Sequence, residues 1–173
     1  GSYSEGTITI DKAVDLIGAN AGIPHDGARG GESIVLDTRL AMENGTTGML
    51  IDGFTFTGTA PGPGTIQATS AIANGVTIQN NRFVDVASSF GAVYTDNAPQ
   101  TDGWVITANL FQNIGFDGDW NNLTAASASA LNPWQASNIT ITNNLIEGVA
   151  YNAINFETVS AGVLQDNVIR DVG

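Results

Sequence analysis

The sequence predicts an all-β chain, folded as a right-handed parallel β-helix (a solenoid) of about five to six coils. Three observations support this prediction. One motif of apolar residues and asparagine recurs along the chain at the spacing of one coil. Apolar and polar residues alternate within each copy, which is the period of a strand. Glycine, asparagine and threonine interrupt every stretch long enough to form a helix.

Four copies of the motif are clear. Residues 76–86 provide the template. Residues 104–114 and 139–149 align with it without insertions or deletions, and the end of the chain aligns through Leu164, Asn167, Ile169 and Val172. A degenerate copy occupies residues 49–56, and residues 16–18 open a sixth. Equivalent apolar residues are offset by 27 from Ile51 to Ile78, then by 28 to Ile106, 35 to Ile141 and 23 to Leu164. Irregular offsets indicate connecting loops of variable length.

Two columns follow from stacking these copies. The core column contains Phe83, Phe111, Ile146 and Ile169. The turn column is a structural ladder of Asn81, Asn109, Asn144 and Asn167, each two residues before the Phe or Ile of its copy. Asparagine tolerates left-handed backbone angles, and its amide can hydrogen-bond the amide one coil away. We therefore interpret these asparagines as structural rather than ligand-binding.

The opening segment, residues 1–22, carries Tyr3, Ile8, Ile10, Lys12, Leu16, Ile17, Gly18 and Asn20. It resembles the first coil of secreted right-handed β-helix proteins of the pectate-lyase-like superfamily, as do the later copies. The resemblance implies the fold across nearly the whole chain. It does not choose an activity, because that superfamily includes polysaccharide lyases, epimerases, esterases, phage tailspikes, adhesins and surface-layer modules.

The composition of the chain excludes several classes of binding partner. Seventeen acidic residues against five basic ones give a formal net charge of −12, so we expect no nucleic-acid partner. No apolar run approaches the ~20 residues of a membrane span, which predicts no membrane insertion. Cysteine is absent, so disulfides and thiolate metal sites are excluded. The 42% hydrophobic content suits a single domain spanning residues 1–173.

No terminal caps are evident in the sequence, although solenoids normally carry them. The chain opens in a strand-like segment, residues 7–10, and closes with residues 169–173, where a copy finishes. We expect an excised fragment, or a subunit whose identical copies stack head to tail.

Candidates for catalysis are few. Lyases and epimerases that act on uronic-acid polymers need a cation or basic side chain beside a base. The residues available for this role are Lys12, Arg29, Arg39, Arg82, Arg170 and the single histidine, His25. The segment of residues 24–26, Pro-His-Asp, resembles the Asp-Pro-His segment of mannuronan epimerases, but Ile23 replaces its aspartate. We therefore expect His25 to be a solvated loop residue and assign no catalytic residue.

Two candidate binding sites lie in or near the longest insertion, residues 116–135, which we expect to be an irregular loop. Asp117, Asp119 and Asn121 alternate as at the start of a calcium loop, although a simple turn is the competing interpretation. Calcium is the one cofactor that the sequence leaves open. Aromatic rings provide platforms for sugars, and the candidates for glycan contact are Trp120, Trp134, Tyr94 and Tyr151. The apolar residues 125–131 leave a second interpretation open, in which the insertion covers the side of the solenoid and buries both tryptophans.

These observations favour a non-catalytic extracellular module of an adhesin, surface layer, matrix or filament, secreted or held at the cell surface. Its partners would be a polysaccharide or identical subunits. The alternative is a polysaccharide lyase or epimerase for uronic-acid polymers. That alternative requires Lys12, His25, Arg82, Tyr94 or Asp96 to converge on one face.

Overall fold

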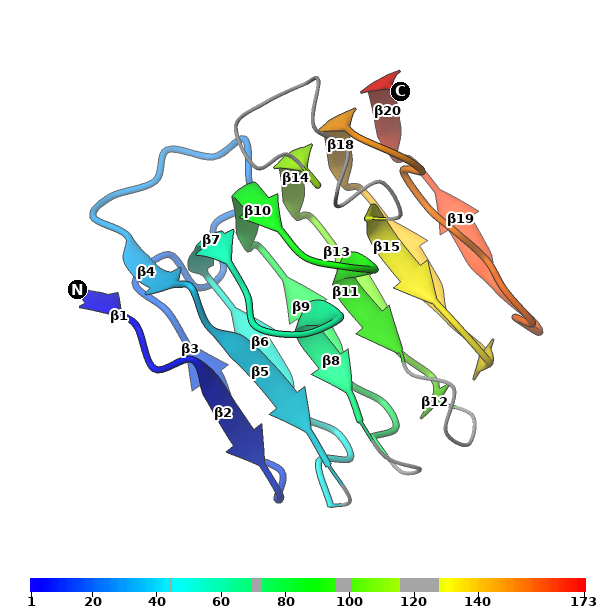
Figure 1. Ribbon diagram of the computed structural model, residues 1–173, viewed down its shortest axis with the longest axis horizontal. Coiled ribbons are helices and arrows are strands. Elements are labelled where there is room, and N and C mark those ends of the chain that lie inside the picture. The colour runs from blue at the N-terminus through cyan, green and yellow to red at the C-terminus, as the bar shows by residue number, and fades with distance from the viewer. Residues whose placement is uncertain (44, 70–72, 96–100, 116–127) are drawn as a thin grey trace.

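The computed structural model describes residues 1–43, 45–69, 73–95, 101–115 and 128–173. Within these residues the regular secondary structure is entirely β, with no helix, and every pairing between strands is parallel. The strands stack along the long axis of the molecule from the N-terminal end to the C-terminal end (Figure 1). The predicted all-β, parallel architecture is therefore confirmed.

Three large sheets and one small sheet make up the fold. The seven-stranded sheet contains, in spatial order, β1 (Ser2–Tyr3), β4 (Ser33–Leu36), β7 (Phe54–Thr59), β10 (Arg82–Ala87), β14 (Leu110–Ile114), β18 (Leu145–Val149) and β20 (Val168–Val172). The five-stranded sheet contains β2 (Thr7–Ile10), β5 (Arg39–Met42), β8 (Gly64–Ala68), β11 (Gly91–Thr95) and β15 (Ser129–Pro133). The six-stranded sheet contains β3 (Leu16–Ile17), β6 (Leu50–Asp52), β9 (Thr77–Gln79), β13 (Val105–Thr107), β17 (Thr140–Thr142) and β19 (Val163–Gln165). The small sheet pairs β12 (Thr101–Asp102) with β16 (Ala136–Ser137).

As far as β18 the chain visits the seven-, five- and six-stranded sheets in that order and then returns to the first. We call each such passage a repeat. Between β18 and β19 it meets the five-stranded sheet only through a bridge from Ile154 to Leu131. The strand register joins the residues that the sequence alignment matches: Ile51 pairs with Ile78, Ile78 with Ile106, and Ile106 with Ile141. Leu16 likewise pairs with Ile51, so the two most degenerate copies belong to the same stack.

The core lies between the three large sheets and is built from stacked columns of apolar side chains. Phe56, Phe83 and Phe111 are fully buried, with successive ring centroids 4.9 and 4.7 Å apart and nearly parallel ring planes. Ile146 continues this column and is also fully buried. In β20 the side chain of Ile169, which pairs with Ile146, is 45% exposed. Burial in this column therefore depends on a neighbouring strand on both sides.

The four ladder asparagines form one hydrogen-bonded column. The Oδ1 atom of Asn109 accepts from the backbone N–H of Asn81 at 2.9 Å, and its Nδ2 atom donates to the Oδ1 atom of Asn144 at 3.0 Å. Asn144 is joined to Asn167 in the same way. Each Nδ2 atom also donates to the backbone oxygen of an isoleucine in the preceding repeat, as from Asn109 to Ile78. The column thus binds each repeat to both of its neighbours.

The left-handed backbone conformation belongs to a different residue than the sequence suggested. It is the residue before each ladder asparagine that has a positive φ, and these residues are Asn80 (54°), Ala108 (56°), Asn143 (56°) and Asp166 (54°). Gly53 occupies the equivalent position with φ 80°. The turn needs one left-handed residue to reverse direction, and the next residue then points its side chain inward, where it finds amide partners. We call these five residues the turn positions.

The prediction that residues 116–135 form an irregular loop is wrong for the C-terminal part of this segment. Residues 129–133 form β15, in which Leu131 pairs with Val93 of β11 and is fully buried. Leu131 fills the inward column of the five-stranded sheet that already contains Val93 and Ile66. Burial of the Leu131 side chain therefore favours a strand here, although the strand ends in a proline, Pro133.

Replacing Asn109 by alanine tests the ladder. Asn109→Ala removes the acceptor of the Asn81 N–H and the donor to the Ile78 oxygen, both buried, so we expect the free energy of unfolding to fall by roughly 3 kcal/mol. The matched variant Asn167→Ala, at the half-buried last position of the ladder between β19 and β20, should cost about 1 kcal/mol. Urea unfolding monitored by circular dichroism measures both. Equal losses in the two variants would contradict the ladder's role in the core.

Candidate functional site

The predicted calcium ligands Asp117, Asp119 and Asn121, together with Trp120, lie outside the described residues. Asp96, one of the residues that a lyase site would need, also lies outside them. Their proposed roles stay predictions.

The other predicted glycan contacts do not gather into an open platform. Tyr94 is 3% exposed, with its ring centroid 5.4 Å from that of Phe90 and 6.4 Å from that of Trp134. A sugar therefore has no exposed face of Tyr94 to rest on. Tyr151, which follows β18, is half exposed and makes no ring contact in the described part of the chain.

A long connection, residues 18–32, runs from β3 back to β4 and is held against the turns of later repeats; we call it the strap. Its first anchor is Asp52, which is 5% exposed. The Asp52 carboxylate accepts the backbone N–H of Gly22 at 3.1 Å, the side chain of Asn80 at 2.9 Å and that of Gln79 at 2.9 Å. These neutral donors satisfy the hydrogen-bonding capacity of the buried carboxylate, so Asp52 fixes the start of the strap.

The second anchor is a two-point ion pair inside the strap. Arg29 Nε and Nη2 each lie 3.0 Å from an oxygen of Glu32, and only 5% of the Arg29 side chain is exposed. Glu32 also accepts from the hydroxyl of Thr55 at 2.9 Å and the amide of Asn20. The hydrogen bond from Arg29 is the main cause that holds the pKa of Glu32 below the ordinary glutamate value. The strap is therefore held by an ion pair as well as by hydrogen bonds to neutral groups.

The strap follows the first three turn positions and donates one hydrogen bond to the backbone oxygen of each. Asn20 N–H donates to Gly53 O at 3.2 Å, Arg29 Nη1 to Asn80 O at 2.7 Å, and His25 N–H to Ala108 O at 3.2 Å. Gly53 is required where the strap comes closest, because a Cβ atom there would overlap the backbone of Asn20 and Ala21. Among the described residues, Ala108 is the last turn position whose backbone oxygen the strap bonds.

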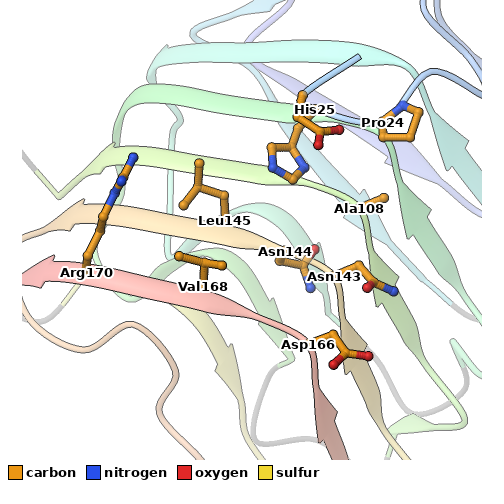
Figure 2. Close-up of a pocket in the computed structure, with 10 residues that line it drawn as sticks. Pro24, His25, Ala108, Asn143, Asn144, Leu145, Asp166, Val168 and Arg170 are labelled. Carbon is orange, nitrogen blue, oxygen red and sulfur yellow. The ribbon is translucent and has the colours of Figure 1, made fainter.

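A cleft of about 630 Å³ begins where the strap ends. In Figure 2 the ring of His25 points into the cleft, with Arg170 on the left and Asp166 at the lower right. Its floor includes Leu145 and Val168, which pair in β18 and β20. The described residues that line it are Pro24, His25, Asp26, Ala108, Asn143, Asn144, Leu145, Asp166, Val168 and Arg170.

The charged groups around the cleft are mainly acidic. Arg170 is paired with Glu147 through Nε at 2.7 Å and through Nη2, so the guanidinium charge is already compensated. Asp26 and Asp166 have no ion pair in the described residues, and Asp166 accepts one hydrogen bond, from Gln165. His25 Nδ1 is buried and has no hydrogen-bond partner in the part of the chain that the structure describes. The arrangement favours cationic or neutral ligands over anionic ones.

The sequence identified His25 and Arg170 as candidate residues but did not predict that they line one cleft. The expectation that His25 is an ordinary loop residue overlooked that the strap carries it across two intervening turn positions to Ala108. Lys12, Arg82 and Tyr94 do not line the cleft. Asn143 and Asp166 went unnoticed as a pair, and the available signal was their common place directly before a ladder asparagine.

Two further observations concern metals and membranes. In the described ranges, no group of three or more His, Asp or Glu side chains is arranged to hold a metal ion. No helix among these residues is long and apolar enough to cross a membrane.

Comparison with known proteins gave no relatives: no family model, no curated protein and no solved structure matches this chain.

The Arg29–Glu32 pair makes the strap sensitive to acid. Because the folded-state pKa of Glu32 is lowered, the pair stabilises the strap above the ordinary glutamate pKa of about 4.3, and this stabilisation is lost as the pH falls through the lowered value. We expect the hydrogen-exchange protection of the His25 amide to fall over that acidic window. Protection factors measured by NMR across the pH range test this.

The variant Glu32→Gln should show reduced protection of His25 at neutral pH and no further loss from this pair in acid. Glu5→Gln, which neutralises an exposed carboxylate outside the strap, is the control and should behave as the native chain. Unchanged protection of His25 in Glu32→Gln would mean that the ion pair does not hold the strap.

Proposed function

We propose that this chain is a right-handed parallel β-helix, similar to the pectate-lyase-like superfamily, and that it serves as a non-catalytic extracellular module. Such a module would form the stiff unit of an adhesin, surface layer, matrix or filament. The observation that carries the proposal is the asparagine column, which joins successive repeats through buried side-chain and backbone hydrogen bonds. Repeats that are bound through their interior as well as their sheets resist separation.

Two features support the β-helix itself. As far as β18 the chain passes through the three large sheets in a constant order, so that strands of one sheet are connected through strands of the other two. Parallel strands joined by such crossovers are right-handed in nearly all proteins. The Phe56, Phe83 and Phe111 stack also fits a narrow interior in which equivalent residues lie one above the other.

The distribution of basic groups supports a non-catalytic role. Arg29 is bound to Glu32 and to the backbone oxygen of one turn position, Asn80. Arg170 is committed to Glu147. A lyase for uronic acids needs a positive group to neutralise the substrate carboxylate, and the uncompensated carboxylates Asp26 and Asp166 beside the cleft oppose the binding of an anion.

The alternative, a polysaccharide lyase or epimerase, is favoured by one observation. His25 and Arg170 line the same cleft, which would place a base and a cation beside one substrate. This alternative requires the Arg170–Glu147 pair to open when substrate binds.

Activity assays separate the two proposals. The purified chain, with and without calcium, is incubated with alginate, pectin and heparinoids, and unsaturated products are followed by ultraviolet absorbance and epimerisation by NMR. We expect no product, because the arginine of the cleft is already paired. Product formation that falls about a hundredfold in both His25→Ala and Arg170→Ala, but not in Lys12→Ala, would establish the lyase or epimerase instead.

A structural unit must also withstand tension. Stretching single molecules between their ends should unfold the native chain at a higher force than Asn109→Ala, because the variant loses hydrogen bonds between three repeats. Glu157→Gln, an exposed carboxylate outside the ladder, should unfold at the native force. Equal forces for all three chains would contradict a mechanical role for the ladder.

A further inference from the structure

We propose that the cleft beyond the strap binds an extended basic peptide segment of a partner protein, which continues the path of the strap over the turns of the last repeats. This inference goes beyond the structural role, because it gives the module a specific site for a partner. Its basis is a track of backbone oxygens that the strap occupies only in part.

The strap shows how a peptide lies on this track. Three successive turn positions, Gly53, Asn80 and Ala108, each have their backbone oxygen bonded by one donor of the strap, at 3.2, 2.7 and 3.2 Å. Two of the donors are peptide N–H groups and the third is an arginine side chain. A peptide with a basic residue is therefore the ligand that this track already binds within the molecule.

The next two turn positions are open. No donor among the described residues bonds the backbone oxygen of Asn143 or Asp166, although both residues share the left-handed conformation of the occupied positions. Both also line the cleft, beside the strap tip at His25 (Figure 2). A peptide entering here would extend the strap's pattern by two positions, with its own N–H groups as donors.

Charge around the cleft selects the kind of peptide. Asp26 and Asp166 line the cleft together with Arg170, and Glu147 is paired with that arginine. Three carboxylates against one guanidinium leave a net charge of −2, and the chain as a whole carries −12. Lysine or arginine side chains would complement this charge, whereas acidic peptides and uronic-acid chains would be repelled.

The floor of the cleft suits the stem of a long basic side chain. Leu145 and Val168 are neighbours in adjacent strands and form an apolar strip between the polar groups at the two ends. Lysine and arginine pack their methylene stems against apolar surface and keep the charged group at a polar edge. The volume of about 630 Å³ lies within the range of ~300–1,000 Å³ found for ligand pockets.

A second hollow indicates that the ligand is extended. It encloses about 370 Å³, is lined by Gln112, Asn113, Glu147, Gly148, Arg170 and Asp171, and shares Arg170 with the cleft. The two hollows therefore adjoin along the outer face of β18 and β20. A peptide that leaves the cleft past Arg170 reaches Glu147 and one further carboxylate, that of Asp171.

The test uses the full chain and an acetylated, amidated hexapeptide in which lysine and valine alternate. Titration calorimetry at low and moderate salt measures the affinity, and NMR shift changes locate the site. We expect the amides of His25, Asn143 and Asp166 to shift, and we expect the affinity to weaken as salt rises. The same peptide with glutamate in place of lysine should not bind, and a peptide N-methylated at alternate residues should bind about tenfold more weakly because it lacks donors.

Two cleft variants and a matched control complete the test. Asp26→Asn and Asp166→Asn should each weaken the lysine peptide about tenfold, and asparagine suits the left-handed conformation at position 166. Glu157→Gln removes the same unit of charge away from the cleft and should leave the affinity unchanged. All three variants should keep the native urea midpoint, so that a failure of binding is separate from a failure of the structural role.

Three results would overturn the proposal. The first is an equal loss of affinity in Glu157→Gln, which would show non-specific attraction to an acidic protein. The second is binding of cellohexaose, used as a neutral glycan probe, at His25 and Asn143 with no binding of the lysine peptide. The third is the absence of shift changes at His25, Asn143 and Asp166 at millimolar concentrations of peptide.

Discussion

The hydrogen bond from one ladder asparagine to the next is the interaction on which the rest of the structure depends. Its two partners lie in adjacent repeats, so it forms only when those repeats stack in register. The same register places Phe83 on Phe111 in the core and aligns the strands of all three large sheets. Because an inward amide without a partner is costly to bury, a shift of register by one residue would lose the ladder and the aromatic stack together.

The ladder also decides the geometry of the outer surface. Each inward asparagine is preceded by a left-handed residue at a turn position, and the backbone oxygens of these positions are available to donors from outside the stack. The strap takes three of them, with Arg29 and His25 among its donors. A constraint in the interior thus produces a regular row of acceptors on the exterior, and the cleft at Asn143 and Asp166 is the part of that row that the strap does not reach.

Electrostatics distinguishes the structural interpretation from the enzymatic one. The few arginines that the structure describes near the cleft and the strap are committed to carboxylates, Arg29 to Glu32 and Arg170 to Glu147. The acidic groups outnumber them across the chain. A surface of this kind repels polyanions and attracts basic partners. The structural module and the peptide site that we propose are compatible, because the ladder acts inside the stack and the site lies outside it.

The alternation of apolar residues and the recurrence of asparagine were enough to predict parallel strands, the pairing of Ile78 with Ile106, and the columns that contain Phe83 and Asn109. Each of these depends on a pattern within one short segment that is then repeated. The pattern did not reveal that Asn80 rather than Asn81 is left-handed, that Leu131 belongs to a strand, or that the strap carries His25 to Ala108. Tertiary structure decided these. The turn must direct the ladder side chain inward, and Leu131 fills a column that Val93 of another repeat provides. The strap bonds to backbone oxygens, which every residue carries and no side-chain pattern marks.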